Sequence, residues 1–525
     1  MQKKFITNLL ILLCLNLLIK PFWILVIEPH VQNSVGNGSY GEYFAIANFS
    51  FLLNILLDFG ITNFNNKNIA QNNHLLSKHF SGLFVLKLML AAVYIIATII
   101  VGLIIGYDGR LTKLLLVLGF NQFLISLVLY LRSNLQALHF FKTDAFLSVL
   151  DRIIMIGVVS LLLWTNFFPG RMDVMDFVYA QTFGYFLTAV IAFFAVVSNT
   201  KIIRLRWNLP FSLMILKKSY PFAILVLLMT FYNRIDTVML ERLLPKGNEA
   251  QTVRLNELRA PNLFPTAAQK EERIYLEKEL KHTGAEQSGV YAKAFRMLDA
   301  VSMVAYLFSI LLLPMFSRML KYKEPVEQLI KLAFTLLITV AVVVAIGSVF
   351  YRTEIMGMLY GKEYLGDVVI VFPLLMSCFV AISTSYIFGS LLTANGNLRE
   401  LNIMAFCGML INVTLNIIFI KVVQMDAIGT AIASLTTQLI TATAQVLIVS
   451  RKFKLKTNYR LLSTLFVYIA GVTAIANLTH TYILNTSSAY GWLLGFGIMA
   501  FSSLAWAFAI RLISIKGIFR ILKYG

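Results

Sequence analysis

A set of charged side chains interrupts the long apolar segments of this sequence, and these residues are the first candidates for binding chemistry. The basic members are Lys20, Lys87, Arg152, Arg234, Lys293 and Arg296, and the acidic members are Asp58, Asp151, Asp236 and Asp299. A charge inside an apolar span costs about 2.5–3.5 kcal/mol on insertion scales, which makes such residues functional candidates. Basic residues outnumber acidic ones in this set, so it favours an anionic ligand.

Several of these positions allow two interpretations. Lys20 either extends to the outer headgroups or lines a lumen, and Pro21 beside it permits a kink. Asp151 and Arg152 point about 100° apart on a helix, so we expect only Arg152 to face a cavity, with a role near the inner headgroups as the alternative. Asp58 lies at the inner end of its segment, where a cap or a gate is expected.

Two neighbouring segments carry charges at matching depth. One contains Arg234 and Asp236, and the next contains Lys293, Arg296 and Asp299 at a spacing of i, i+3, i+6, which covers one side of a helix. We predict an ion pair between Asp236 and Arg296, because neither charge is tolerated alone in lipid. The pair is either static and structural, or it also touches the substrate or switches during opening.

The elements that position these residues are apolar segments long enough to cross a membrane. Hydrophobic residues make up 58% of the chain and charged residues 13%, against about 25% charged residues in soluble domains. Segments of about 20 apolar residues predict an all-α integral membrane protein with about 14 transmembrane helices, since lipid excludes open sheets. The predicted spans are 5–27, 42–62, 80–106, 111–131, 145–168, 174–198, 219–243, 288–313, 328–350, 367–393, 398–422, 427–450, 460–482 and 489–513.

The distribution of Lys and Arg between loops predicts the orientation. The net charge of +20 sits in short runs between apolar segments, which is typical of a membrane protein and does not favour nucleic acid as a partner. Alternate loops are rich in Lys and Arg, and the positive-inside rule places them in the cytoplasm together with both termini. The opposite short loops hold only Arg110, Lys113, Arg171, Arg352 and Lys362. We interpret residues 1–27 as a first span, because the apolar stretch is too long for a signal peptide.

One long polar stretch, residues 245–287, falls on the outer side of this topology. Thr266 and Gln269 have the spacing of a capping box and predict a charged helix that ends near Gly284. The stretch is either a tolerated loop insertion or a periplasmic docking site for a partner.

Short motifs in a consistent order carry a family resemblance. Gly41-Glu42-Tyr43 and Gly289-Val290-Tyr291 open spans that lie six apart, which is typical of two parallel six-helix halves. Further motifs are Leu57-Asp58-Phe59-Gly60-Ile61, Arg234–Leu240, Ser288–Arg296, Leu392–Asn397 with Asn412 and Asn416, and Ala427–Ser434. With these motifs the chain resembles the Wzx-type polysaccharide flippases (O-antigen, capsule or exopolysaccharide) of the MATE-like exporter superfamily known as MOP. It departs from them in the 245–287 insertion.

The resemblance implies a fold and an activity. It implies a V-shaped arrangement of two six-helix lobes, 1–200 and 201–450, followed by two additional helices and a cytoplasmic tail in 451–525. The expected activity is the flipping of a polyprenyl-diphosphate-linked oligosaccharide across the bacterial cytoplasmic membrane by alternating access, without catalysis or a cofactor, with a coupling ion left open. Membrane lipid and polysaccharide polymerase or assembly proteins are the expected partners. The basic candidates would bind the diphosphate, for which arginine is the better bidentate partner, and the acidic ones would form gates or ion pairs.

Two other functions remain open at this point. A MATE-type exporter coupled to Na⁺ or H⁺ would need buried carboxylates without basic neighbours, whereas most acidic candidates here have them. A membrane-embedded polymerase or ligase would need catalytic residues on an outer loop, and 245–287 has neither a nucleophile–base pair nor metal-ligand spacing. Trp23, Tyr232 and Tyr306 either stack on sugars or pack in the core.

Overall fold

The structure, a computed structural model, confirms the all-α prediction. It describes residues 15–62, 75–138, 140–165, 172–198, 209–258, 266–361, 365–455, 458–483 and 491–513. Every regular element within these ranges is a helix, and 12 of the helices are long and apolar enough to cross a membrane. Of the remaining two predicted spans, 42–62 corresponds to an interrupted helix. Residues 5–14 of the span 5–27 lie outside the described residues, and the rest of it is helical with a π-helical turn at Trp23–Ile27.

The chain divides into two compact units, Met1–Gly289 and Val290–Gly525. The division falls within α12 (Gly284–Lys321), and each unit is described here by itself. The predicted division into lobes 1–200 and 201–450, with 451–525 as an addition, stays a prediction.

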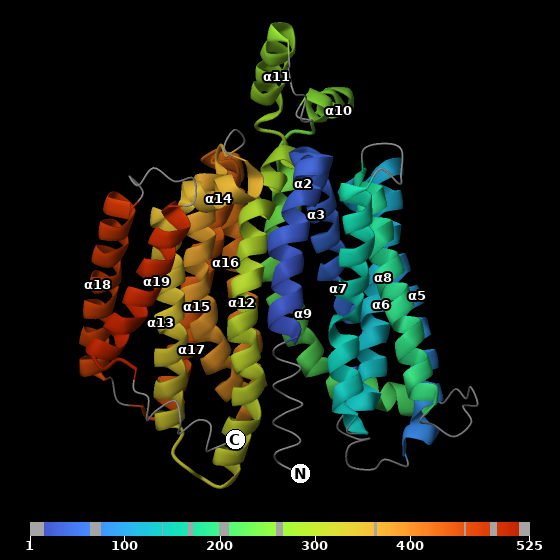
Figure 1. Cartoon of the computed structure of the whole chain (residues 1–525). Coiled ribbons are helices and arrows are strands. Elements are labelled where there is room, and N and C mark those ends of the chain that lie inside the picture. The colour runs from blue at the N-terminus through green and yellow to red at the C-terminus, as the bar shows by residue number, and fades with distance from the viewer. Residues whose placement is uncertain are drawn as a thin grey trace. The chain divides into compact units, whose positions relative to one another are not determined.

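The first unit is a bundle of helices that lie side by side from α2 to α9 (Figure 1). Within it α6 packs against α5 and α8, and α3 packs against α9. Its elements are η1 (Trp23–Ile27), α2 (Glu28–Val35), α3 (Asn37–Leu52), η2 (Asn54–Leu57), α5 (Leu75–Ile105), α6 (Gly109–Ala137), α7 (Phe141–Trp164), α8 (Val174–Val197), α9 (Leu209–Leu243), α10 (Glu249–Leu258) and α11 (Ala267–Leu280).

Within the described residues, both of the first two spans depart from a regular α-helix. The first contains η1, a π-helical turn of the kind often found at functional sites. The second begins at Asn37, earlier than predicted, and its regular part ends at Leu52. A short 3₁₀ turn follows, and Phe59 and Gly60 then take positive φ angles of 43° and 79°. The chain therefore makes a turn at residues 58–60.

The early start of α3 has a clear cause in side-chain hydrogen bonds. Asn37 Nδ2 donates to the Glu286 backbone carbonyl at 2.9 Å and to Glu286 Oε2 at 2.7 Å. Gln32 Nε2 donates to the Gly289 carbonyl at 3.0 Å. These polar residues are buried, and hydropathy excluded them from the predicted span because it does not register such partners.

The two glycines of the matching motifs meet at this crossing. A Cβ atom on Gly41 would lie 2.0 Å from the Ala285 carbonyl oxygen and 2.5 Å from the Gly289 nitrogen. A Cβ atom on Gly289 would lie 2.2 Å from the Asn37 carbonyl oxygen. Both positions require glycine because the helix backbones touch there, as at other small-residue helix crossings in membranes.

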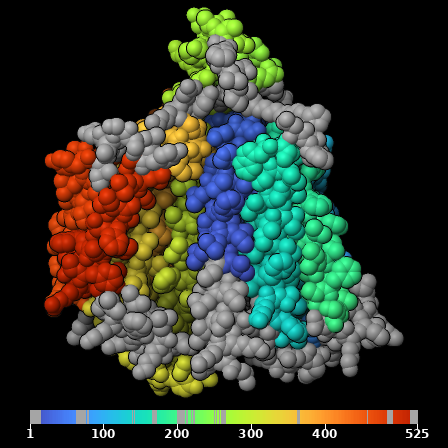
Figure 2. Space-filling view, in the orientation of Figure 1, coloured from blue at the N-terminus to red at the C-terminus, as the bar shows by residue number. Residues whose placement is uncertain are grey.

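The polar stretch after α9 folds into a hairpin of α10 and α11, which stands clear of the bundle (Figures 1 and 2). The capping box of Thr266 and Gln269 is present as predicted. Leu255 and Leu258 of α10 pack against Leu276 and Leu280 of α11 in a small core. The sequence predicts α11, whereas α10 was not predicted.

The second unit continues from α12, and its elements follow a similar pattern of long helices (Figure 1). In it α15 packs against α13 and α17, α16 packs against α17, and α18 packs against α13 and α19. Its further elements are α13 (Glu327–Phe350), α14 (Arg352–Tyr360), α15 (Val368–Ala394), α16 (Leu398–Ile417), η4 (Ile418–Val422), α17 (Asp426–Lys452), α18 (Tyr459–Ile483) and α19 (Gly491–Ala509).

Candidate functional site

Basic side chains from three helical segments gather in the first unit, where they form what we call the cationic cluster: Lys20, Arg132, Asp151 and Arg152. Lys20 lies on the segment before η1, Arg132 near the end of α6, and the other two within α7. Lys20 interacts electrostatically with Arg152, Asp151 and Arg132. Among the described residues, Lys20 has no carboxylate at salt-bridge distance. The structure thus brings together two of the predicted basic residues, one predicted acidic residue and Arg132.

Two aromatic rings hold Arg152 in place. Its Cζ atom lies 5.6 Å from the centroid of the Trp23 ring and 5.7 Å from that of the Tyr185 ring, within the range of cation–π attraction. Its Nε atom lies 3.8 Å from Asp151 Oδ2. The long arginine side chain therefore reaches its neighbour although the two residues point about 100° apart on the helix. The Arg152 side chain is 25% exposed.

Trp23 is a buried residue whose ring contacts the Arg152 guanidinium. Its ring is buried, stacks on Phe177 at a centroid distance of 5.8 Å, and donates through Nε1 to Glu28 Oε1 at 2.8 Å. Of the two interpretations of its aromatic ring, core packing describes what the structure shows. The ring contributes to binding only through the guanidinium that it supports.

Arg132 is a member of the cluster that lies just beyond the predicted span 111–131 but within α6. Its Nε atom donates to Asp144 Oδ1 at 2.7 Å, and Gln136 Nε2 donates to Asp144 Oδ2 at 2.9 Å. Even with Asp144 included, basic side chains outnumber carboxylates in the cluster. The available signal was that Arg132 and Asp144 flank the same short turn between two spans, which brings them close in space.

A second group of charges in the first unit has a different character. Lys87 of α5 is 2% exposed, forms an ion pair with Asp58, and donates to Ser126 Oγ at 2.8 Å. Asp58 also accepts a hydrogen bond from the Thr62 hydroxyl at the turn that follows η2. We call this group the buried ion pair after its lysine, since the Asp58 side chain is 27% exposed. It joins the interrupted second span to α5 and α6.

Arg234 and Asp236 lie on α9 in the same unit. The Arg234 guanidinium lies 5.6 Å from the centroid of the Phe51 ring, and Asp236 is 2% exposed. The predicted pair of Asp236 with Arg296 would join the two units and stays a prediction.

In the second unit the predicted basic residues have partners close in sequence or on a neighbouring helix. Lys293 is buried, and its Nζ atom lies 5.2 Å from the centroid of the Tyr360 ring. Arg296 NH1 lies 3.6 Å from Asp299 Oδ2, one turn further along α12. The i, i+3 spacing noted in the sequence therefore does produce an ion pair, within one helix.

These observations define a class: a multi-pass α-helical membrane protein in which charge clusters are built into the spanning helices. The family can also be assigned. The family model described as "Polysaccharide biosynthesis protein" matches residues 5–320, and the chain belongs to this family, as its motifs predicted. No curated protein sequence matches the chain.

Two solved structures support the fold. One is the lipid II flippase MurJ in an inward closed conformation, with a TM-score of 0.62 and 13% sequence identity over 94% of this chain and 97% of that one. Another is a multidrug resistance MATE family transporter of the MOP superfamily in an inward-facing conformation, with a TM-score of 0.59 and 13% identity over 83% of this chain and 94% of that one. The chain therefore has the MATE-like fold of this superfamily.

Proposed function

We propose that this chain flips a polyprenyl-diphosphate-linked oligosaccharide across the bacterial cytoplasmic membrane by alternating access, with both termini in the cytoplasm. The observation that carries the proposal is the cationic cluster. In a chain that belongs to a polysaccharide biosynthesis family and whose motifs resemble flippases, an excess of basic charge inside the spans matches a substrate whose headgroup is a diphosphate.

The chemistry of the cluster suits this headgroup. Arg152 offers a planar fork of donors that binds two phosphate oxygens at once, and Lys20 offers a compact point charge. The rings of Trp23 and Tyr185 hold the guanidinium in advance, so less side-chain entropy is lost when it binds. Interactions between charges are stronger at a partly buried site than in water.

Asp151 has a role in the empty state. Basic side chains that face one another repel, and the Asp151 carboxylate lowers this repulsion while no substrate is bound. Its Oδ1 atom is buried without a hydrogen bond among the described residues, so the carboxylate is only partly satisfied. A diphosphate carries more negative charge and more acceptor oxygens, and it displaces Asp151 as the partner of Arg152 during transport.

The test is complementation of a strain that lacks this gene. Wild-type protein restores surface polysaccharide, whereas Lys20→Ala and Arg152→Ala leave it absent and cause lipid-linked precursor to accumulate in the inner leaflet. Arg110→Ala is the matched control, because this arginine is 55% exposed and pairs with Glu42 at the end of a span. It should restore display fully.

Membrane levels of each variant are measured by immunoblotting, so that loss of insertion is separated from loss of transport. Wild-type display in both cluster variants would contradict the proposal. Sensitivity of the deletion strain to toxic compounds without precursor accumulation would instead favour a MATE-type exporter.

A further inference from the structure

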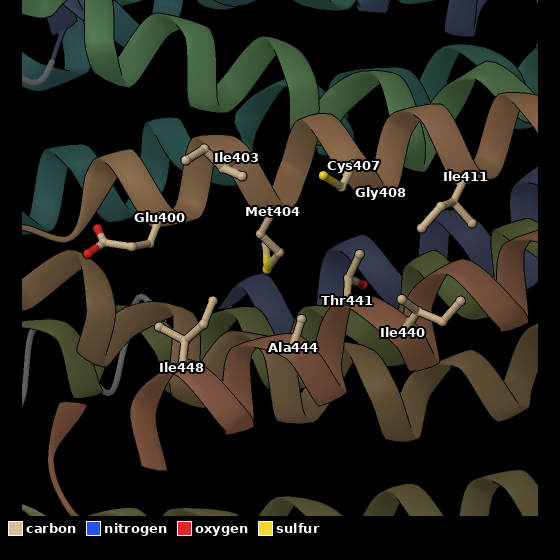
Figure 3. Close-up of a pocket in the computed structure, with 10 residues that line it drawn as sticks. All are labelled: Glu400, Ile403, Met404, Cys407, Gly408, Ile411, Ile440, Thr441, Ala444 and Ile448. Carbon is tan, nitrogen blue, oxygen red and sulfur yellow. The ribbon is translucent and has the colours of Figure 1, made fainter. Parts of the chain in front are cut away.

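An apolar groove runs between α16 and α17 in the second unit (Figure 3). Its volume is about 300 Å³, and the side chains that face each other across it include Ile403, Met404 and Ile411 from α16 and Ile440 and Ile448 from α17. Ala444 and Gly408 also line it, and their small size leaves the space open. No residue of the cationic cluster or of the buried ion pair is among those that line this groove.

The groove has the length of one leaflet. From Glu400 to Ile411 it extends roughly 16 Å along α16, at 1.5 Å per residue. The hydrocarbon core of a bilayer is about 30 Å thick, so the groove spans about half of it. Ile403 and Ile440 at its rim are 55% and 44% exposed, which allows a chain to enter sideways from the bilayer.

Among the residues that line the groove, the charged one, Glu400, lies at one end. Glu400 in the first turn of α16 pairs with Lys452 in the last turn of α17, and it also accepts a hydrogen bond from Asn397 Nδ2 at 3.2 Å. Arg399 and Arg451 are exposed at the same helix ends. A lysine ammonium has three donors, so Lys452 can bind a further anion without releasing Glu400. The excess of positive charge at this end faces an apolar channel.

We propose that this groove binds one acyl chain of an anionic phospholipid from the cytoplasmic leaflet, with the lipid phosphate beside Lys452. The positive-inside rule assigns the basic end to the cytoplasm, where anionic headgroups collect at basic pockets between helices. The acyl chain fills the space between α16 and α17 and packs against both helices. The proposal holds whether or not the chain is a flippase.

The first test maps lipid contacts. The full chain is reconstituted into vesicles that contain phosphatidylglycerol with a photoreactive diazirine in its acyl chain, and cross-linked peptides are identified by mass spectrometry. Cross-links should concentrate on 403–411 and 440–448. Ala444→Phe fills the groove and should reduce them about tenfold. Leu447→Phe is the matched control, because Leu447 is on the same helix, is 52% exposed and lies outside the groove; it should change nothing.

The second test concerns the headgroup. With diazirine-labelled phosphatidylcholine in place of phosphatidylglycerol, labelling of the groove should fall severalfold, and Lys452→Gln should remove the difference between the two lipids. Lys321→Gln, at the exposed end of α12, should preserve it. Equal labelling of all lipid-facing helices would overturn the proposal. Displacement of the phosphatidylglycerol by equimolar polyprenyl phosphate would also overturn it, because it would assign the groove to a prenyl chain.

Discussion

The cationic cluster and the buried ion pair contain the same kinds of residue, yet their geometry separates their roles. In the buried ion pair, Lys87 and Asp58 balance one another, and Ser126 takes a further hydrogen bond from Lys87. In the cationic cluster, Lys20 lacks a salt-bridge partner among the described residues, and Arg152 is 25% exposed. Asp58, at 27% exposed, is as accessible as Arg152, so the difference lies in the charge balance and in the burial of Lys87. Balanced charge stabilises a fold, whereas unbalanced charge is available to a ligand.

The largest effect should come from breaking the buried ion pair. Lys87→Met leaves the Asp58 carboxylate without its cation. Removing one partner of a fully buried pair costs about 3–5 kcal/mol, which is an upper bound here because Asp58 is 27% exposed. We expect a large fall in the thermal midpoint of the purified protein in detergent. The double variant Lys87→Met with Asp58→Asn should recover much of the loss, because no uncompensated charge then remains. Equal midpoints for wild type and Lys87→Met would show that the pair is not enclosed as described.

Substitutions in the cationic cluster should lower the transport of precursor and leave the thermal midpoint almost unchanged. Arg152→Lys keeps the charge but loses the planar fork, and a loss of about tenfold in precursor flipping corresponds to about 1.4 kcal/mol. The thermal midpoint should change little, since the lysine can still lie over Trp23. Lys20→Arg is the control, because a fork in place of a point charge retains phosphate binding. Transport is measured as the decline of labelled precursor in the inner leaflet, and an Arg152→Lys protein with normal transport would reduce the cluster to an electrostatic role.

The sequence alone predicted the depth of these charges but not their neighbours. Hydropathy located most of the spans, because lipid requires long apolar helices. It placed Asp58 and Lys87 in consecutive spans without indicating that they meet, since the angular position of a side chain depends on how the helices pack. The interruption of the second span at Phe59 and Gly60 was likewise not predicted, although it turns Asp58 toward Lys87.

The α10–α11 hairpin was also predicted only in part, because one of its two helices depends on contacts with the other. The predicted helix α11 carries a strong local signal in its capping box. By contrast, α10 has no such signal, and Leu255 and Leu258 become informative only once they pack on Leu276 and Leu280. A short helix that depends on tertiary contacts is marginal in isolation, and its sequence therefore resembles that of a polar loop.

The smallest effect should come from a third kind of ion pair, which lies at the surface of the α10–α11 hairpin. Arg254 of α10 donates to both carboxylate oxygens of Glu272 on α11, at 2.8 and 2.9 Å, and both side chains are exposed. Arg254→Ala should leave transport and the overall thermal midpoint unchanged, because exposed pairs contribute little and are screened by salt. It should increase hydrogen exchange only in α10 and α11, and high salt should reproduce this increase in the wild type.

The ion pair between Arg254 and Glu272 should also make the stability of the α10–α11 hairpin depend on pH. The hydrogen bonds from Arg254 lower the pKa of Glu272, so the carboxylate is more acidic in the folded hairpin than in an unfolded chain, where its pKa is about 4.3. The stabilisation is therefore fully present above about pH 4.3 and is lost as the pH falls through the lowered pKa. Acidification should thus lower the protection of α10 and α11 in the wild type, measured as the exchange rate relative to the intrinsic rate at the same pH, whereas Arg254→Ala should already show low protection at neutral pH. An identical pH profile for both proteins would mean that the α10–α11 hairpin depends on its leucine core alone.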